Sequence, residues 1–375
     1  MADNKDKKVL NVPALRFPEF TDEWQHILNK ELFNPVSDKN KDKIITLILS
    51  ASQTEGMIER NNIGIDIKFD ENSVKNYKIV RTGDYVVHLR SFQGGFAFSE
   101  LTGICSPAYT ILRPNKQLQY GFLRAYFMSK KFIDSLRLVT YGIRDGKSIS
   151  VEEWMQLYTN IPSDKEQDKI IKLFNILDER IKLQNKIIEK LETLIKGIRN
   201  NIMSKIKGDC ITLQDIADIY QPQTIASTDL TEDGYLVYGA NGIIGKYHSF
   251  NHEKEQICIT CRGNTCGTVN FTEPKSWITG NAMVINTDNY AKNVNKRYLF
   301  HYLSSINFNS IISGSGQPQI VRQPLAKLKL ILPVLIIQNR IAECLDAMFA
   351  KMKNEQSFLQ ILQIQKSCLL SQMFI

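Results

Sequence analysis

The sequence lacks the marks of a secreted or membrane-spanning protein. The charged first residues, 1–8, are not followed by the apolar run of a secretion signal. The most apolar stretch, Leu328–Ile337, is broken by Lys329 and Pro333 and is too short to cross a bilayer. The seven cysteines are odd in number and irregularly spaced, which argues against a disulfide framework and suits a reducing compartment. We therefore expect a cytoplasmic protein without a membrane partner.

Motifs for catalysis and for metal binding are also missing. An adenine methyltransferase needs a Gly-rich turn after a strand and an Asp/Asn-Pro-Pro-aromatic loop, but Asn34–Ser37 has only one proline and no aromatic residue. Residues 142–148 resemble a phosphate-binding loop with glycines one residue too close. Cys258, Cys261 and Cys266 do not have the spacing of a zinc finger, and a strand would point the first two to opposite faces. We predict no catalytic residue, no metal and no cofactor.

The composition is that of a globular protein with a positive charge. The 375 residues suit two or three domains, with 43% hydrophobic and 23% charged side chains. The net charge of +8 favours a polyanionic partner. A mildly basic protein without such a partner remains an alternative on charge alone.

The clearest periodic segment predicts a long helix from Ser163 to Ile206. Ser163 or Asp164 can cap its N-terminus, and no proline interrupts it. Its length of about 40 residues corresponds to roughly 60 Å, and a helix with such a stripe needs a partner helix. The apolar stripe consists of Ile170, Leu173, Phe174, Leu177, Ile181, Ile187, Ile188, Leu191, Leu194, Ile195, Ile198 and Ile202.

The same pattern recurs 171 residues further along the chain. Pro162 corresponds to Pro333, and Gln167 corresponds to Gln338. A second long helix is therefore predicted after Pro333, in an internal repeat of a mixed domain followed by a helix. Its apolar stripe consists of Ile341, Leu345, Met348, Met352, Leu359, Leu362, Leu369 and Met373.

Polar residues interrupt both stripes at corresponding places. These are Arg180 and Gln184 in the first helix, and Lys351 and Glu355 in the second. If the helices pack antiparallel, Arg180 faces Glu355 and Gln184 faces Lys351, which would fix the helix register. Four unrelated solvated side chains are the alternative.

The regions before the helices correspond as well. Residues 120–129 and 296–305 predict short amphipathic helices, and each is followed by a Gly-containing polar loop. Strand-like runs precede them, so the fold class is mixed α/β (α+β) with an internal pseudo-twofold repeat. We predict four parts: a first domain at 1–162, a helix at 163–206, a second domain at 207–333 and a helix at 334–375.

Three segments carry a resemblance to a known family. Val12–Trp24, Ile161–Gln167 and Leu369–Ile375 resemble segments of the specificity subunits of type I restriction–modification systems. The resemblance implies two target recognition domains, each reading one half of a bipartite site in double-stranded DNA, joined by two antiparallel coiled-coil helices. It implies partners, namely two modification (methyltransferase) subunits and restriction subunits, which carry out methylation and cleavage. One departure is Val334–Gln338, which replaces the polar helix start by an apolar one.

Polar loops in both halves are candidates for reading DNA. Base edges are read by Arg, Asn, Gln, Ser and Thr side chains, while phosphates are held by basic side chains and backbone amides. Such loops follow strands at matching places in the two halves; solvated loops are the alternative. The candidate residues are Arg90, Ser91, Gln93, Tyr141, Arg144 and Lys147 in the first half, and Asn241, Arg262, Asn264, Thr265, Ser315, Gln317, Gln319 and Arg322 in the second.

Two other functions remain open on the sequence. A catalytic DNA-modifying enzyme would bind S-adenosylmethionine. A structural adaptor that assembles proteins through its coiled coil would have no sequence-dependent affinity for DNA.

Overall fold

The chain folds into two compact units that share two long helices. The computed structural model describes residues 10–52, 55–63, 71–88, 95–141, 148–240, 242–314 and 316–375. The first unit comprises Met1–Gln184 and Phe358–Ile375, and the second comprises Asn185–Ser357. The long helices are α5 (Asp164–Lys205) and α8 (Leu335–Met373), and each contributes to both units. None of the helices in the described ranges is long and apolar enough to cross a membrane.

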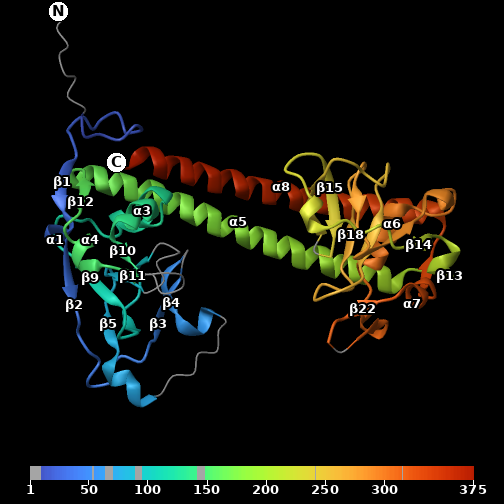
Figure 1. The fold of residues 1–375 in the computed structure, drawn as a ribbon, viewed down its shortest axis with the longest axis horizontal. Helices are drawn as coiled ribbons and strands as arrows, with labels where there is room; N and C mark the ends of the chain where they lie inside the picture. The colour runs from blue at the N-terminus through green and yellow to red at the C-terminus, as the bar shows by residue number, and fades with distance from the viewer. Residues whose placement is uncertain are drawn as a thin grey trace, which may run out of the picture. The chain divides into compact units, whose positions relative to one another are not determined.

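The first unit is built around an antiparallel sheet in the order β2-β9-β6-β7 (Figure 1). Its central strand, Tyr85–Val87, is buried on both faces because the sheet is covered on both sides. The sheet strands are β2 (Phe33–Val36), β6 (Tyr85–Val87), β7 (Phe96–Phe98) and β9 (Thr110–Pro114). Pairs beside it are β1 (Gln25–Leu28) with β12 (Tyr158–Ile161), β3 (Leu49–Ser52) with β4 (Gly56–Glu59), β5 (Lys78–Val80) with β8 (Gly103–Cys105), and β10 (Thr140–Tyr141) with β11 (Ser148–Ile149). Its short helices are α1 (Asn29–Leu32), α2 (Phe122–Phe127), α3 (Lys130–Ser135) and α4 (Val151–Trp154).

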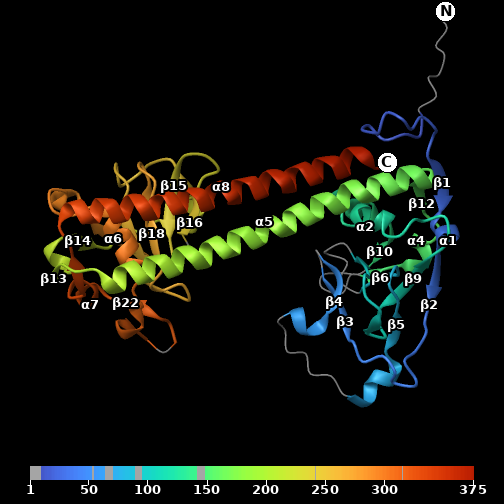
Figure 2. The ribbon, with the colours of Figure 1, turned by 180° about the vertical axis from the view of Figure 1, so that it is seen from behind.

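The core of the first unit is rich in aromatic rings and continues onto the long helices. Phe96 packs against Phe127 and Trp154, with ring centroids 4.9 and 4.8 Å apart. The same core includes Phe174 on α5 and Phe374, just after α8. In this unit the beginning of α5 therefore packs against the end of α8, which makes the two segments antiparallel (Figure 2).

The second unit has the same sheet topology, in the order β14-β20-β17-β18. Its sheet strands are β14 (Asp218–Tyr220), β17 (Ile257–Thr260), β18 (Val269–Phe271) and β20 (Ala282–Asn286). Pairs that match the first unit are β13 (Asp209–Thr212) with β23 (Lys329–Leu332) and β21 (Ile312–Ser313) with β22 (Gln319–Ile320). A further sheet joins β15 (Tyr235–Gly239) to β16 (Gly242–Tyr247) and β19 (Trp277–Ile278). The short helices are α6 (Lys296–Leu303) and α7 (Arg322–Ala326).

The matching strand orders confirm the internal repeat and the mixed fold class. Strand for strand, β2, β9, β6 and β7 correspond to β14, β20, β17 and β18, and α2 corresponds to α6. In the second unit the end of α5 packs against the beginning of α8, where Met203 and Leu345 share a cluster. The two helix segments of this unit are therefore also antiparallel.

A buried glutamine fixes the start of each long helix to its domain. The Gln167 side chain accepts from the Gln119 N–H at 2.9 Å and donates to the carbonyls of Gln117 and Pro162 at 3.0 and 3.1 Å. Gln338 accepts from the Asn295 N–H at 2.8 Å and donates to two carbonyls at 2.9 and 2.8 Å. Its two acceptors are the carbonyls of Asn293 and Pro333. Both glutamines have no exposed surface. The repeated Pro-x(4)-Gln pattern thus corresponds to one repeated structural device.

The observed helix α5 differs from the prediction at the edges of its apolar stripe and at its two ends. Most of the predicted stripe of α5 is buried or half-buried, but Ile187 and Leu194 are 44% and 56% exposed. Their inclusion in the packed stripe was wrong, because a broad apolar arc is wider than the face that one partner helix covers. The observed bounds, 164–205, differ by one residue at each end from the predicted ones.

For the predicted polar layer of Arg180, Gln184, Lys351 and Glu355, the structure gives a contact within α8. Lys351 Nζ lies 2.7 Å from Glu355 Oε1, one turn along the same helix. Gln184 is buried at 5% exposure. The cross-helix pairing of Arg180 with Glu355 and of Gln184 with Lys351 stays a prediction.

Candidate nucleic-acid interface

Two predicted loops of the second unit are joined by backbone contacts. The segment after β17 forms a bridge with the β21–β22 hairpin, in which Arg262 is opposite Gln319. The Gly263 N–H donates to the Pro318 carbonyl and the Ile320 N–H donates to the Cys261 carbonyl, both at 3.0 Å. The structure therefore brings the predicted Arg262 and Gln317 clusters together, although they are more than 50 residues apart in the sequence.

A third predicted loop joins them through a shared carbonyl. Ala240, in the turn between β15 and β16, accepts from Thr260 Oγ1 at 2.8 Å and from Thr265 Oγ1 at 2.6 Å. The Thr265 hydroxyl therefore holds two loops together, a structural role that the sequence did not indicate. Asn241, which follows Ala240, lies outside the described residues.

The side chains suited to base edges are on the outside of this surface. Arg262, Asn264, Gln317 and Gln319 are exposed. Arg322 is also exposed, but its Nε donates to the Ile219 carbonyl at 2.7 Å, which anchors the start of α7 to β14. Exposed amide and guanidinium groups on hydrogen-bonded loops can form bidentate contacts with purines in the major groove.

Glycines make the turn between β17 and β18 possible. Gly263 and Gly267 have φ of +84° and +91°, a conformation that other residues adopt at a cost. A Cβ at Gly267 would lie 3.4 Å from the Phe308 Cβ, so this turn also packs closely on its neighbour. The exposed side chains that were predicted to read DNA therefore extend from a turn whose backbone is held in place.

The described strands next to the predicted loops of the first unit are paired, as they are in the second unit. The His88 N–H donates to the Gly95 carbonyl at 2.8 Å, which continues the pairing of β6 with β7. A Cβ at Gly95 would collide with the Ile149 side chain, so this hairpin lies against β11. The predicted readers on the two loops lie outside the described residues, except Tyr141. Those outside are Arg90, Ser91, Gln93, Arg144 and Lys147, as is Ser315 of the second unit.

Tyr141 is exposed but already has a partner. Its hydroxyl donates to Glu153 Oε2 at 2.5 Å, and this hydrogen bond is the main cause that raises the pKa of Tyr141. The phenol ring is 54% exposed at the end of β10. Tyr141 can thus offer a ring for stacking while its hydroxyl is held by Glu153.

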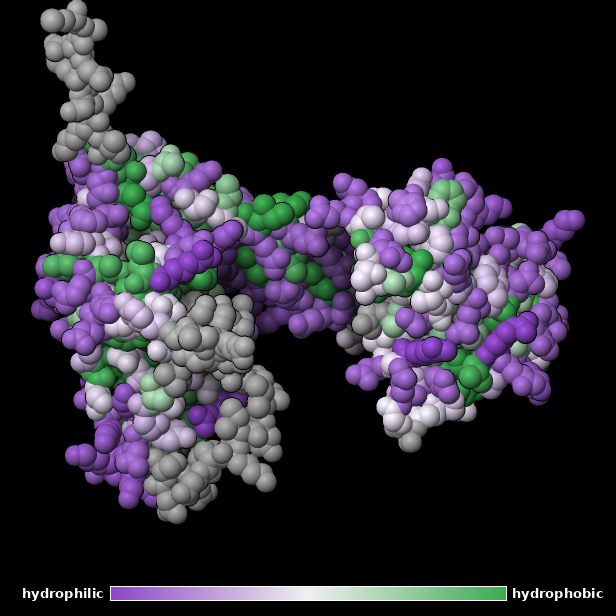
Figure 3. All heavy atoms as spheres, viewed as in Figure 1, coloured by the Kyte–Doolittle hydropathy of each residue, from purple (hydrophilic) through white to green (hydrophobic). Residues whose placement is uncertain are grey.

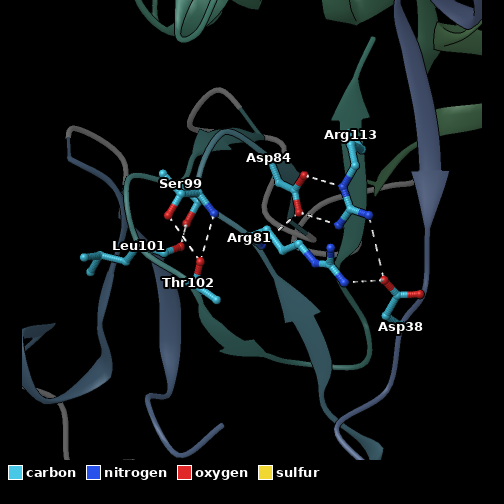
Figure 4. A network of polar contacts seen from close by, with 8 residues as sticks. Asp38, Arg81, Asp84, Ser99, Leu101, Thr102 and Arg113 are labelled. Atoms are coloured by element: carbon cyan, nitrogen blue, oxygen red, sulfur yellow. Dashed lines mark hydrogen bonds and ion pairs between the residues drawn. The ribbon is translucent and has the colours of Figure 1, made fainter.

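Arginines elsewhere in the first unit are held in structural ion pairs. Arg113 donates to both Asp84 oxygens at 2.9 and 3.0 Å, and this bidentate contact raises the pKa of Arg113 (Figure 4). Asp38 lies 3.8 Å from Arg113 and 4.0 Å from Arg81. The Arg113–Asp84 contact ties β9 to the turn before β6, so Arg113 has a structural role, unlike the exposed Arg262.

Two cysteines of the Cys258, Cys261 and Cys266 group belong to the interior of the second unit, and Cys266 is half-buried. Cys258 and Cys261 have no exposed surface, and burial raises the pKa of Cys258 to about 12. The Gln221 amide donates to Cys261 Sγ at 3.1 Å. Across the described ranges, no group of three or more His, Cys, Asp or Glu side chains is placed to hold a metal ion.

Known proteins resemble this chain in sequence and in fold. Residues 209–363 match the family model described as type I restriction modification DNA specificity domain. The second half of the chain carries a type I DNA specificity domain. The chain is 28% identical over 169 residues to the type I restriction enzyme EcoprrI specificity subunit of Escherichia coli, and 28% identical over 116 residues to a putative type I specificity subunit of Haemophilus influenzae. These matches cover 44% and 30% of this chain, and 41% and 29% of those relatives.

The fold of the chain is similar to that of solved type I specificity subunits. The S subunit of the type I restriction–modification system from M. genitalium superposes with a TM-score of 0.64, over 97% of this chain and 99% of that one, at 15% identity. A structure from a study of complex assembly and conformational transition of the type I system has a TM-score of 0.58, over 94% of this chain and 97% of that one, at 16% identity. The family model over residues 209–363, the curated relatives and the fold all agree with the resemblance that the sequence suggested.

Proposed function

We propose that this chain is the DNA specificity subunit of a type I restriction–modification complex and that each unit reads one half of a bipartite site. The observation that carries this proposal is the joining of the Arg262, Gln317 and Ala240 loops into one surface with exposed base-reading side chains. The first unit repeats the sheet order that positions this surface. Two copies of one scaffold with different loops suit a site with two different halves.

The chain has no enzymatic activity of its own in this proposal. The curated relatives are described as specificity subunits, and the sequence lacks the Gly-rich cofactor turn and the Asp/Asn-Pro-Pro-aromatic loop that an adenine methyltransferase needs. Partner subunits carry out methylation and cleavage. A chain that retained labelled S-adenosylmethionine in equilibrium dialysis would contradict this division of labour.

Two modification subunits dock on the long helices, with restriction subunits completing the assembly. On α5, the apolar residues Ile176, Leu183, Ile187 and Leu194 are 44–58% exposed and recur at intervals of seven, four and seven residues. Such spacing places them on one side of the helix, and Figure 3 shows apolar side chains that interrupt the polar surface of the long helices. An exposed apolar stripe beside a packed one suits a further helix from a partner.

The long helices also set the distance between the half-sites. They are helical over 42 and 39 residues, and each contributes to both units. A rigid helix adds about 1.5 Å per residue, so helix length would determine the number of base pairs between the half-sites.

Methylome sequencing tests the proposal in a host that carries the complete system. We expect one methylated bipartite motif, with two specific halves and a spacer of fixed length, that disappears when this chain is deleted. If methylation persisted unchanged without the chain, or if its motif had no second half, the proposal would fail.

A further inference from the structure

A polar cleft lies beside the turn that carries Arg262 and Thr265. It has a volume of about 660 Å³, and its walls come from α5, from the turn at 266–268 and from the segment 304–312. The Cys266 N–H donates to the Gly263 carbonyl and the Thr268 N–H donates to the Thr265 carbonyl, each at 3.0 Å. The reading turn and the cleft wall are therefore parts of one hydrogen-bonded structure.

The α5 wall of this cleft is positively charged. Lys196, Arg199 and Asn200 face it from three positions on the helix. Arg199 is half-buried, and burial lowers the pKa of its guanidinium. Its Nε is buried and makes no hydrogen bond within the described residues.

Asp346 follows Leu345, which packs with Met203 of α5, and this carboxylate is already paired. Asp346 accepts from Arg297 Nε at 2.8 Å and lies 2.7 Å from His301 Nε2. Burial is the main cause that lowers the pKa of His301, and the charge of Arg199 lowers it slightly further. Among the described residues no carboxylate pairs with Arg199, and a half-buried arginine without a neutralising partner costs stability unless a ligand supplies the charge.

The internal repeat allows Arg199 to be compared with the residue at the corresponding position in the first unit. The shift of 171 residues that aligns the two helix sequences makes Arg199 correspond to Leu370, and Met203 correspond to Phe374. Leu370 is 7% exposed in the core of the first unit, and Met203 and Phe374 are buried in their own units. The second unit thus has an arginine at a position where the same scaffold accepts a leucine.

We propose that this cleft binds a backbone phosphate of the DNA next to the half-site read by the second unit, with Arg199 and Lys196 as its cationic contacts. The inference rests on the proposed function, because it makes the cleft a continuation of the reading surface. Arg199 presents a planar guanidinium that suits phosphate oxygens, and Lys196 is an exposed point charge three residues before it. DNA is favoured over an acidic protein segment because the cleft shares the reading turn.

The test uses the full chain assembled with its modification subunits and a duplex that carries the methylated motif. The Arg199→Leu variant copies the first unit, and we expect it to be at least as heat-stable as wild type but to bind DNA about tenfold more weakly, the usual size of one charged hydrogen bond. The slope of log K against log salt should become shallower by about 0.9. A Lys196→Gln variant should change affinity and slope in the same direction. Lys190→Gln, an exposed lysine of the same helix outside the cleft, is the matched control and should behave as wild type.

A scan of single methylphosphonates along the duplex identifies the phosphate. Neutralising that phosphate should weaken wild type about tenfold and leave the Arg199→Leu variant almost unchanged, because the same contact cannot be lost twice. The inference would be overturned if the Arg199→Leu variant had the affinity and the salt slope of wild type. It would also be overturned if every methylphosphonate weakened the variant as much as it weakened wild type. If the variant lost its modification subunits but the assembled fraction kept wild-type DNA affinity, the occupant would be an acidic protein segment and the inference would also be wrong. Wild type that failed to prefer its motif over unrelated DNA would instead contradict the proposed function.

Discussion

Replacing Gln338 by Ala should open the second unit and leave the first unit unchanged. The substitution removes an amide that accepts from the Asn295 N–H and donates to the carbonyls of Asn293 and Pro333. A buried polar group left without its partner costs about 1–3 kcal/mol. Three such groups, with some relief as water enters the space, give an expected loss of about 3–4 kcal/mol. The Gln167→Ala variant should cause a similar loss in the first unit, because its hydrogen bonds are the same.

Hydrogen exchange followed by mass spectrometry measures the two units separately, which one global unfolding curve of a two-unit chain cannot do. Protection should fall in β13, β23 and the start of α8 for Gln338→Ala, and in β1, β12 and the start of α5 for Gln167→Ala. Gln363→Ala, an exposed glutamine on α8, is the control and should change protection by less than about 0.5 kcal/mol. If Gln338→Ala behaved like this control, the buried amide would not hold the helix start to the domain, and the reasoning would be refuted.

Three further predictions concern recognition, spacing and pH. Substituting Arg262, Asn264 or Gln317 by Ala should relax one half-site by about 1–3 kcal/mol per lost contact and leave the other half-site intact; methylome sequencing of variant hosts checks this, and equal blurring of both halves would contradict it. Inserting seven residues in the middle of both α5 and α8 should lengthen the pair by about 10 Å, which corresponds to about three base pairs of spacer; methylation of duplexes with graded spacers measures it, and an unchanged spacer preference would argue against the helices as a ruler. Burial lowers the pKa of His301 in spite of its contact with Asp346. Its neutral form therefore stabilises the second unit above about pH 6.5, and this contribution is lost as the pH falls through the lowered pKa. Exchange protection of the second unit, corrected for intrinsic rates, should fall from pH 7 to pH 5, and less so in His301→Gln; an equal fall in both proteins would exclude His301 as its cause.

The sequence predicted the long helices and the repeat well because both depend on local and periodic signals. The stripe that begins at Ile170 and the proline at 162 place the start of α5 within one residue of its observed position. The repeat was visible because the same apolar pattern occurs in both halves of the sequence. The matching strand orders of the two sheets confirm the correspondence.

Contacts between distant segments could not be predicted from those signals. Thr265 was expected to read bases, yet its hydroxyl donates to Ala240, which is 25 residues away in the sequence. Arg322 is anchored to the carbonyl of Ile219 over 103 residues. Arg199 was missed because it lies in a helix that was explained by its apolar stripe. Its one signal was the comparison with Leu370 in the aligned repeat, which gains meaning only when the burial of both positions is known.

The two halves keep a common scaffold and differ where a partner would touch them. At the start of α5, Arg16 donates to Glu166 at 2.7 Å, so the segment before β1 covers that helix end. No such segment can precede β13, because the residues before it are the end of α5 itself. The start of α8 correspondingly presents Val334 and Ile336, which are 69% and 58% exposed, where α5 has a serine and a lysine. An apolar pair at an uncovered helix start costs solubility in an isolated chain, which an interface with a modification subunit would offset. If modification subunits dock at both helix starts as proposed, the two docking surfaces therefore differ chemically: one includes a polar, covered helix start and the other an apolar, exposed one.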